Sequence, residues 1–248
     1  MFHANDRKKQ EFFPGPSIPD YVWEEVNREE NGKLGGGIGV LMKADGYLSV
    51  WEGIEENSER MWVTYENGEE KHAFCGVYLA VKPFKNKNPE DQNAEILNLL
   101  QLEMAKLTAQ NYSVSLCGDF NSWLGTTGPY GMPENRDHIN PNGQLLIDFM
   151  TPRNIKLANK FEQAEGVYTR FPDRKECKPS VLDLVLLEEE MYSKLTAFVV
   201  DEDNTYGVTS DHRLVLHCIT YIIKYIIFYE LLFYYNMRCN YFMIYYLL

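Results

Sequence analysis

Positive charge is in short supply in this sequence of 248 residues. It holds 24 lysines and arginines against 36 aspartates and glutamates, so its formal net charge is −12 at pH 7. This balance argues against non-specific affinity for nucleic acid or for anionic membranes. It leaves open a nuclease in which a divalent cation meets the phosphate. The balance reverses at residues 152–178, where seven basic residues accompany four acidic ones. A solvated face and a phosphate-facing rim both explain that stretch.

Cysteine is sparse and irregularly placed. The five cysteines are an odd number, and no two of them form a Cys-x-x-Cys pair. We therefore expect neither a disulfide framework nor a zinc site, and we expect a reducing compartment. The first ten residues, MFHANDRKKQ, contain no apolar stretch of the kind that a signal peptide requires. An intracellular protein that is not secreted is the expectation.

No apolar run is long enough for a membrane-spanning helix. Residues 219–248 are almost all Ile, Tyr, Phe, Leu, Asn and Met, but Lys224, Glu230 and Arg238 interrupt them before about 18 apolar residues accumulate. These residue types share A/T-rich codons, so a translated non-coding stretch explains them more simply than a membrane anchor does. We expect an atypical tail here and no association with a membrane.

The common phosphate-binding glycine motifs are also missing. In GKLGGGIGVLM the lysine precedes the glycines and no Gly-Lys-Ser/Thr follows, which excludes a P-loop. Gly37 and Gly39 are followed by Met42 where G-x-G-x-x-G requires a third glycine. A tight turn into a packed strand is the better interpretation.

What the sequence does contain is an alternation of apolar strands with two amphipathic helices. Helical periodicity predicts helices over 94–110 and 140–154, the second with Asn140 or Asn142 as its N-cap and Pro152 as its stop. Short apolar runs predict strands at 35–44, 47–54, 61–66, 71–81, 114–120, 155–161, 167–172, 181–188 and 213–218. This pattern predicts an α/β fold in which two sheets pack face to face with helices outside.

The stretch SLCGDFNSWLG ends an apolar strand with a carboxylate and a carboxamide two residues apart. Residues at i and i+2 leave a strand on the same face, so Asp119 and Asn121 are expected to point into one cleft. Such a pair suits the binding of a metal, a phosphate or a water. Gly, Asp and Asn are also ordinary turn residues, so a simple turn is the alternative.

Three further stretches carry polar residues beside apolar strands. GVYLAV contains Tyr78, PSVLDLVLL contains Asp183, and GVTSDHRLVL places Ser210, Asp211 and His212 before a closing strand. An unpaired carboxylate inside an apolar strand would be costly, which predicts a partner for Asp183. Taken singly, such an Asp caps a loop and such a His is structural. Taken together, they predict one site with an imidazole held by a buried carboxylate.

These motifs, in this order and at these intervals, resemble the endonuclease/exonuclease/phosphatase superfamily, with particular similarity to the endonuclease domains of non-LTR retrotransposons. CGDFNSWLG, SVLDLVLL and TSDHRLVL carry the resemblance, and GGGIGVLM, GVYLAV and GPYGMPENRDHINPNGQLLIDFM extend it. It covers residues 21–218, between an irregular segment 1–20 and the tail 219–248. It implies a four-layer α/β sandwich of two mixed sheets flanked by helices, and Mg²⁺-dependent (or Mn²⁺-dependent) hydrolysis of a phosphodiester in DNA.

The resemblance also implies roles for single residues. Asp119 would orient or deprotonate the attacking water, and Asn121 would position that water and the phosphate. His212 would contact the phosphate, with Asp183 fixing its tautomer. Tyr78 would donate a hydrogen bond to the scissile phosphate. The metal would be bound by Asp211 together with Asp119, without any small-molecule cofactor.

The N-terminal part departs from the family pattern, which begins with an apolar strand ending in Asn, a helix, and a second strand ending in Gln-Glu. Gln10-Glu11 has the dipeptide but follows NDRKK, which is not a buried strand. We therefore expect a truncated domain with weakened metal binding. Three functions stay open at this point: a DNA endonuclease, nuclear if it acts on genomic DNA; a phosphatase or phosphodiesterase for a small phosphorylated substrate; and an inactive retroelement-derived fragment.

Overall fold

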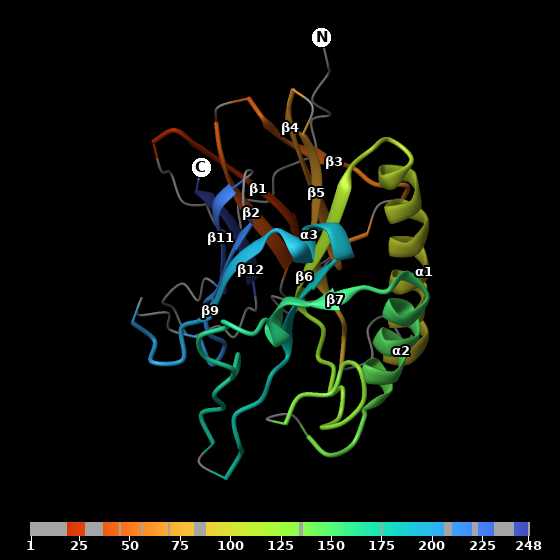
Figure 1. Ribbon diagram of the computed structural model, residues 1–248, viewed down its shortest axis with the longest axis vertical. Coiled ribbons are helices and arrows are strands. Elements are labelled where there is room, and N and C mark those ends of the chain that lie inside the picture. Colours follow the sequence, from red (N-terminus) through yellow and green to blue (C-terminus); the bar gives the residue numbers. More distant parts are fainter. Residues whose placement is uncertain are drawn as a thin grey trace.

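In the part of the chain that it describes, the computed structural model contains two six-stranded sheets with three α-helices (Figure 1). Residues 19–27, 37–44, 46–55, 57–68, 70–81, 88–133, 136–174, 176–205 and 210–219 are described, together with the backbone of two strands, 223–230 and 241–247. The segment containing Gln10-Glu11 lies outside them. None of the described helices is long and apolar enough to cross a bilayer.

Sheet A has the strand order β1-β2-β12-β11-β10-β9. It is mixed, because β12 runs parallel to β2 while all other neighbouring strands of the sheet are antiparallel. Its strands are β1 (Tyr21–Asn27), β2 (Gly37–Lys43), β9 (Leu195–Val200), β10 (Val215–Ile219), β11 (Ile223–Glu230) and β12 (Tyr241–Leu247).

Sheet B has the order β3-β4-β5-β6-β8-β7 and is also mixed, because only β5 and β6 are parallel. Its strands are β3 (Leu48–Trp51), β4 (Arg60–Asn67), β5 (Glu70–Tyr78), β6 (Ser113–Asp119), β7 (Lys156–Leu157) and β8 (Asp183–Leu187). The predicted α/β sandwich of two mixed sheets is therefore confirmed.

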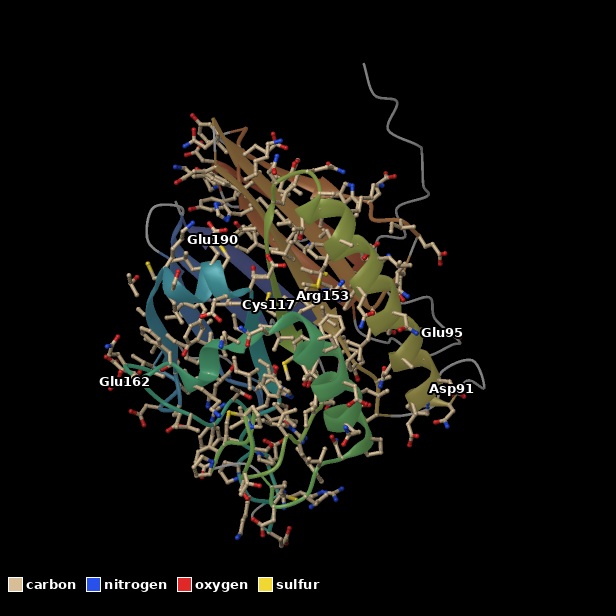
Figure 2. The ribbon with its side chains drawn as sticks, turned by 45° about the vertical axis from the view of Figure 1, so that its right-hand side comes forward. Asp91, Glu95, Cys117, Arg153, Glu162 and Glu190 are labelled. Atoms are coloured by element: carbon tan, nitrogen blue, oxygen red, sulfur yellow. The ribbon has the colours of Figure 1, made fainter. Side chains whose placement is uncertain are left out.

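Two apolar layers hold these sheets. Between the sheets, alternate residues of β5, β6 and β8 meet side chains of β2, β9 and β10; this cluster includes Val40, Phe74, Cys117, Val185, Phe198 and Val215. The opposite face of sheet B packs against α1 (Pro89–Thr108) and α2 (Pro141–Met150), which lie side by side in Figure 1. In Figure 2, Asp91 and Glu95 project from the outer side of α1, whereas Cys117 lies in the interior. Strand residues of one parity thus face the other sheet, and those of the other parity face the helices.

Several local predictions need correction. The first helix begins at Pro89 rather than at residue 94, because the Asn88 side chain accepts a hydrogen bond from the backbone N–H of Glu90 and caps it. Residues 167–172 do not form a strand. Arg170 makes only isolated bridges, between Gly166 at φ 72° on one side and Pro172 on the other. Strands β1 and β9 and the short helix α3 (Glu189–Ser193) were not predicted.

The glycine-rich entry to β2 has a packing role. A Cβ atom on Gly39 would lie 2.1 Å from Cη2 of Trp23 on the neighbouring strand β1, so only glycine lets the indole cross the sheet here. The interpretation of this stretch as a packed strand agrees with that contact.

The region predicted as an atypical tail provides two strands of sheet A. β11 pairs with β10, and β12 joins β11 to β2. The sequence predicts no regular element there, since uniformly apolar and aromatic residues carry no alternation that marks a strand. The division of the chain at residues 20 and 218 stays a prediction.

Acid should destabilise the protein through two buried histidines. Burial lowers the pKa of His72 to about 4 and that of His217 to about 3. Above pH 6.5 both are neutral whether the chain is folded or unfolded, but below it only the unfolded chain binds the protons readily. The free energy of unfolding should therefore fall as the pH drops from about 6.5 towards 3, by about 1.4 kcal/mol per pH unit for His217.

Urea denaturation across this pH range measures the effect. His217→Gln should reduce the slope of unfolding free energy against pH, whereas the same change at the exposed His138 should not. An unchanged slope in His217→Gln would contradict this account.

Candidate active site

Three of the candidate side chains stand on adjacent strands of sheet B. Tyr78 ends β5, Asp119 ends β6 and Asp183 begins β8, and Asp119 is the register partner of both others. Tyr78 shares its strand face with Phe74, Asp119 with Cys117, and Asp183 with Val185, all of which lie between the sheets. The loop segments 120–133, 136–140, 165–174 and 176–180 gather at this end of the sheets, low in Figure 1.

Asp119 and Asp183 lie directly opposite each other on the neighbouring strands β6 and β8. The backbone N–H of Phe120 donates to the carbonyl of Leu182 at 3.1 Å, which makes Asp119 and Asp183 a non-hydrogen-bonded antiparallel pair. Side chains in such pairs lie near each other, and like charges there repel. Both are nearly buried, with exposed fractions of 2% and 7%. Each therefore needs its own compensating donor.

Asn121 supplies the donors for Asp119. Its backbone N–H donates to Asp119 Oδ1 at 2.8 Å and its side-chain amide donates to Oδ2 at 2.7 Å. Asn121 has a φ of 46°, in the left-handed region that Asn tolerates better than most residues. The amide also donates to the Leu79 carbonyl at 3.0 Å. The turn that the sequence presented as the alternative is therefore present and joins the two side chains directly, and the binding role of this pair stays a prediction.

The preceding glycine is required by close backbone approach. Gly118 has a φ of 143°, and a Cβ there would lie 2.0 Å from the carbonyl oxygen of Val77. Only glycine adopts this conformation readily. It brings the ends of β5 and β6 together and so sets Tyr78 beside Asp119.

His212 supplies the donor for Asp183. Its Nδ1 lies 2.9 Å from Asp183 Oδ2 and 3.1 Å from Oδ1, and both side chains are buried. The backbone N–H groups of Leu182 and Asp183 donate to the Thr169 hydroxyl at 2.9 and 3.0 Å, which holds the start of β8 in place. With Nδ1–H donated to the carboxylate, the imidazole presents Nε2 as its other nitrogen. The partner predicted for Asp183 is thus present.

Asp211 lies next to His212 but has a different partner. Its Oδ2 forms an ion pair with Nε of Arg170 at 2.8 Å, and its side chain is 29% exposed. The basic stretch 152–178 is divided by the fold. Lys156 pairs with Glu189 at the far end of β8, Arg153 donates to the Gln101 carbonyl, and Arg170 stays at the site.

A network of buried amide side chains supports the turn that contains Asn121. The sequence did not predict this supporting role. Asn93 of α1 donates to Oδ1 of Asn142 and to the carbonyl of Ala80, both at 2.8 Å. Asn140 caps α2 by accepting from Gly143 at 2.8 Å and donates to the carbonyl of Asn121 at 2.9 Å. Asn140 and Asn142 were noted only as possible caps. The signal available in the sequence was a polar Asn93 on the largely apolar buried face of α1.

The described residues do not on their own fit a tightly bound metal. Within the ranges that the structure describes, no three His, Cys, Asp or Glu side chains form a group that could hold a metal ion. Both carboxylate oxygens of Asp119 accept from Asn121, and Asp211 is engaged by Arg170. The metal-binding roles predicted for Asp119 and Asp211 stay predictions.

The chain is similar to solved structures, although no protein-family model matches it and no curated protein matches its sequence. Similar solved structures include the endonuclease domain of TRAS1, a telomere-specific non-LTR retrotransposon, with 17% identity over 82% of this chain and 81% of that one and a TM-score of 0.56. The AP endonuclease LMAP from Leishmania major has 12% identity, coverage of 81% and 71%, and a TM-score of 0.59.

An endonuclease/exonuclease/phosphatase family protein from Bacteroides thetaiotaomicron is also similar, with 14% identity over 79% of this chain and 74% of that one and a TM-score of 0.50. The chain therefore has the endonuclease/exonuclease/phosphatase fold, as its motifs predicted.

Proposed function

We propose that the chain hydrolyses phosphodiester bonds, with DNA as its substrate. The observation that carries this proposal is the juxtaposition of Asp119 with the Asp183–His212 pair on one face at one end of the sheets. Hydrolysis needs a group that orients and deprotonates water and a cation that meets the phosphate charge. A buried carboxylate beside a carboxylate-held imidazole supplies both.

Each residue then has a step. Asp119 orients the attacking water and takes its proton, while Asn121 holds the Asp119 carboxylate in place through its two hydrogen bonds. As the water oxygen bonds to phosphorus, the P–O bond to the 3′ oxygen breaks, and that leaving oxygen takes a proton from solvent. His212, fixed by Asp183, binds a non-bridging phosphate oxygen through Nε2 and stabilises the charge that develops there. The Tyr78 hydroxyl donates a hydrogen bond to the same phosphate. Action on genomic DNA would require the protein to reach the nucleus.

Plasmid nicking tests the proposal. The purified chain at saturating Mg²⁺ should convert supercoiled plasmid to the open circle, and Asp119→Ala should lose this activity. The matched control is Asp148→Asn on the exposed face of α2. Nicking no faster than that of Asp119→Ala would sink the proposal and favour an inactive fragment. A parallel assay on inositol phosphates tests the small-substrate alternative, which the net charge of −12 favours.

We also propose that Mg²⁺ or Mn²⁺ assists the reaction but binds weakly. Mg²⁺ requires near-octahedral oxygen ligands, and the two carboxylates available, Asp119 and Asp211, already have partners. Calorimetric titration should give a Kd on the order of millimolar or weaker. Tight binding that is lost on Glu11→Gln would contradict this prediction and would identify Gln10-Glu11 as part of the metal site.

A further inference from the structure

Arg170 is fixed between two segments of the active site. It exchanges two backbone hydrogen bonds with Ser180, at 2.9 and 3.0 Å. On its other side it forms a bridge with His212, flanked by hydrogen bonds from Phe171 to Asp211 and from Arg213 to Thr169, both 2.7 Å long. This bond pattern makes Arg170 and His212 a non-hydrogen-bonded antiparallel pair, in which the two side chains leave the backbone on the same face and close together.

The guanidinium of Arg170 is only partly engaged. Its Nε donates to Asp211 Oδ2, and neither terminal amino group forms a hydrogen bond with any residue that the structure describes. The side chain is 38% exposed, so water and a ligand can reach it. The terminal edge of a guanidinium carries two parallel N–H donors, which match two oxygens of one phosphate.

Two other cations near the site are directed at the protein. Lys160 donates to the carbonyl of Pro129 at 2.7 Å, and Arg213 donates to the carbonyls of Glu202 and Ser210 at 3.2 and 3.0 Å. Arg170 differs because its partner is a carboxylate that leaves the terminal edge open. The arrangement matches the neighbouring pair, in which Asp183 holds His212 through one ring nitrogen.

We propose that Arg170 is a phosphate-binding residue of this site and that Asp211 is its positioning residue, as Asp183 is for His212. The proposal rests on the proposed function and adds to it a second cation on the backbone phosphates of a nucleic acid. It also gives Asp211 a role other than metal ligation. Because the Asp211 carboxylate is neutralised by the guanidinium, Arg170 competes with a divalent cation for it.

Metal-free binding of a short DNA duplex tests the proposal apart from catalysis. All variants carry Asp119→Asn and are measured in EDTA by fluorescence anisotropy over a range of salt concentrations. Arg170→Gln should raise the Kd about tenfold and lower the slope of log K against log salt by about one. Arg170→Lys should fall between, because it keeps the charge but not the paired donors. Lys160→Gln is the control for loss of a nearby charge.

The direction in which Asp211→Asn changes the affinity for DNA shows whether Asp211 positions Arg170 or only repels the phosphates. Removing a negative charge beside a polyanion should strengthen binding if Asp211 has no other role, whereas loss of the positioning contact should weaken it. In the Arg170→Gln background the same substitution should no longer weaken binding. In addition, Arg170→Gln in the otherwise native chain should bind Mg²⁺ more tightly than the parent.

Three results would overturn the proposal: no duplex binding by the parent at low salt, an Arg170→Gln variant that binds like the Lys160→Gln control, or tighter binding by Asp211→Asn. Absence of nicking with these binding effects intact would instead count against the proposed hydrolysis alone. The two proposals can therefore fail separately.

Discussion

Asp183→Asn should lower the rate of phosphodiester hydrolysis about 10²- to 10⁴-fold, although Asp183 does not touch the phosphate. Both of its carboxylate oxygens lie within 3.1 Å of Nδ1 of His212, so the carboxylate can only accept from that nitrogen. An amide in the same place can also donate, which permits the tautomer that carries its proton on Nε2. The imidazole would then lose both its orientation and its stabilised cationic form.

Steady-state kinetics check this prediction. We expect kcat to fall with little change in KM, because Asp183 orients His212 and does not itself touch the phosphate. Asp148→Asn should leave both quantities unchanged. An Asp183→Asn variant with the kcat of the parent would contradict this role for Asp183.

Glu103→Ala should destabilise the fold by about 3–5 kcal/mol. Glu103 on α1 is fully buried, and its carboxylate accepts from Arg60 Nη2 at 2.6 Å and from Trp62 Nε1 at 2.8 Å on β4. It also accepts from the backbone N–H of Ile54 at 2.7 Å. Removing it leaves the Arg60 guanidinium buried without this counter-charge and removes the hydrogen bonds that join this part of α1 to β4.

Urea denaturation measures the difference in unfolding free energy. The control is Glu95→Ala on the exposed side of the same helix, which should change it by about 0.5 kcal/mol or less. Glu103→Gln should lie between, since the amide oxygen can still accept from Arg60 and Ile54 but carries no charge and leaves the indole N–H of Trp62 without an acceptor. A loss from Glu103→Ala no larger than that from Glu95→Ala would show that the buried ion pair contributes nothing to stability.

Features that depend on residues close together in the sequence were predictable. The spacing of Asp119 and Asn121, the apolar strands on either side of them and the caps of the second helix depend on residues two to four apart. The α/β class followed from the alternation of these elements, and the motif set indicated the fold that the solved structures share. In each case a periodicity or a local backbone preference carries the information, so no knowledge of packing was needed.

What only the tertiary structure decided involves residues far apart in the chain. Arg170 meets Asp211 across 41 positions, Asn93 meets Asn142 across 49 and Arg60 meets Glu103 across 43. No sequence pattern selects those partners, because charge and polarity show that a buried group needs a partner but not which one it has. The same limit applies to sheet A, in which β12 pairs with β2 although about two hundred residues separate them along the chain. Loop closure and the packing of the two sheets determine which distant residues and strands pair. They therefore also determine which groups surround Asp211.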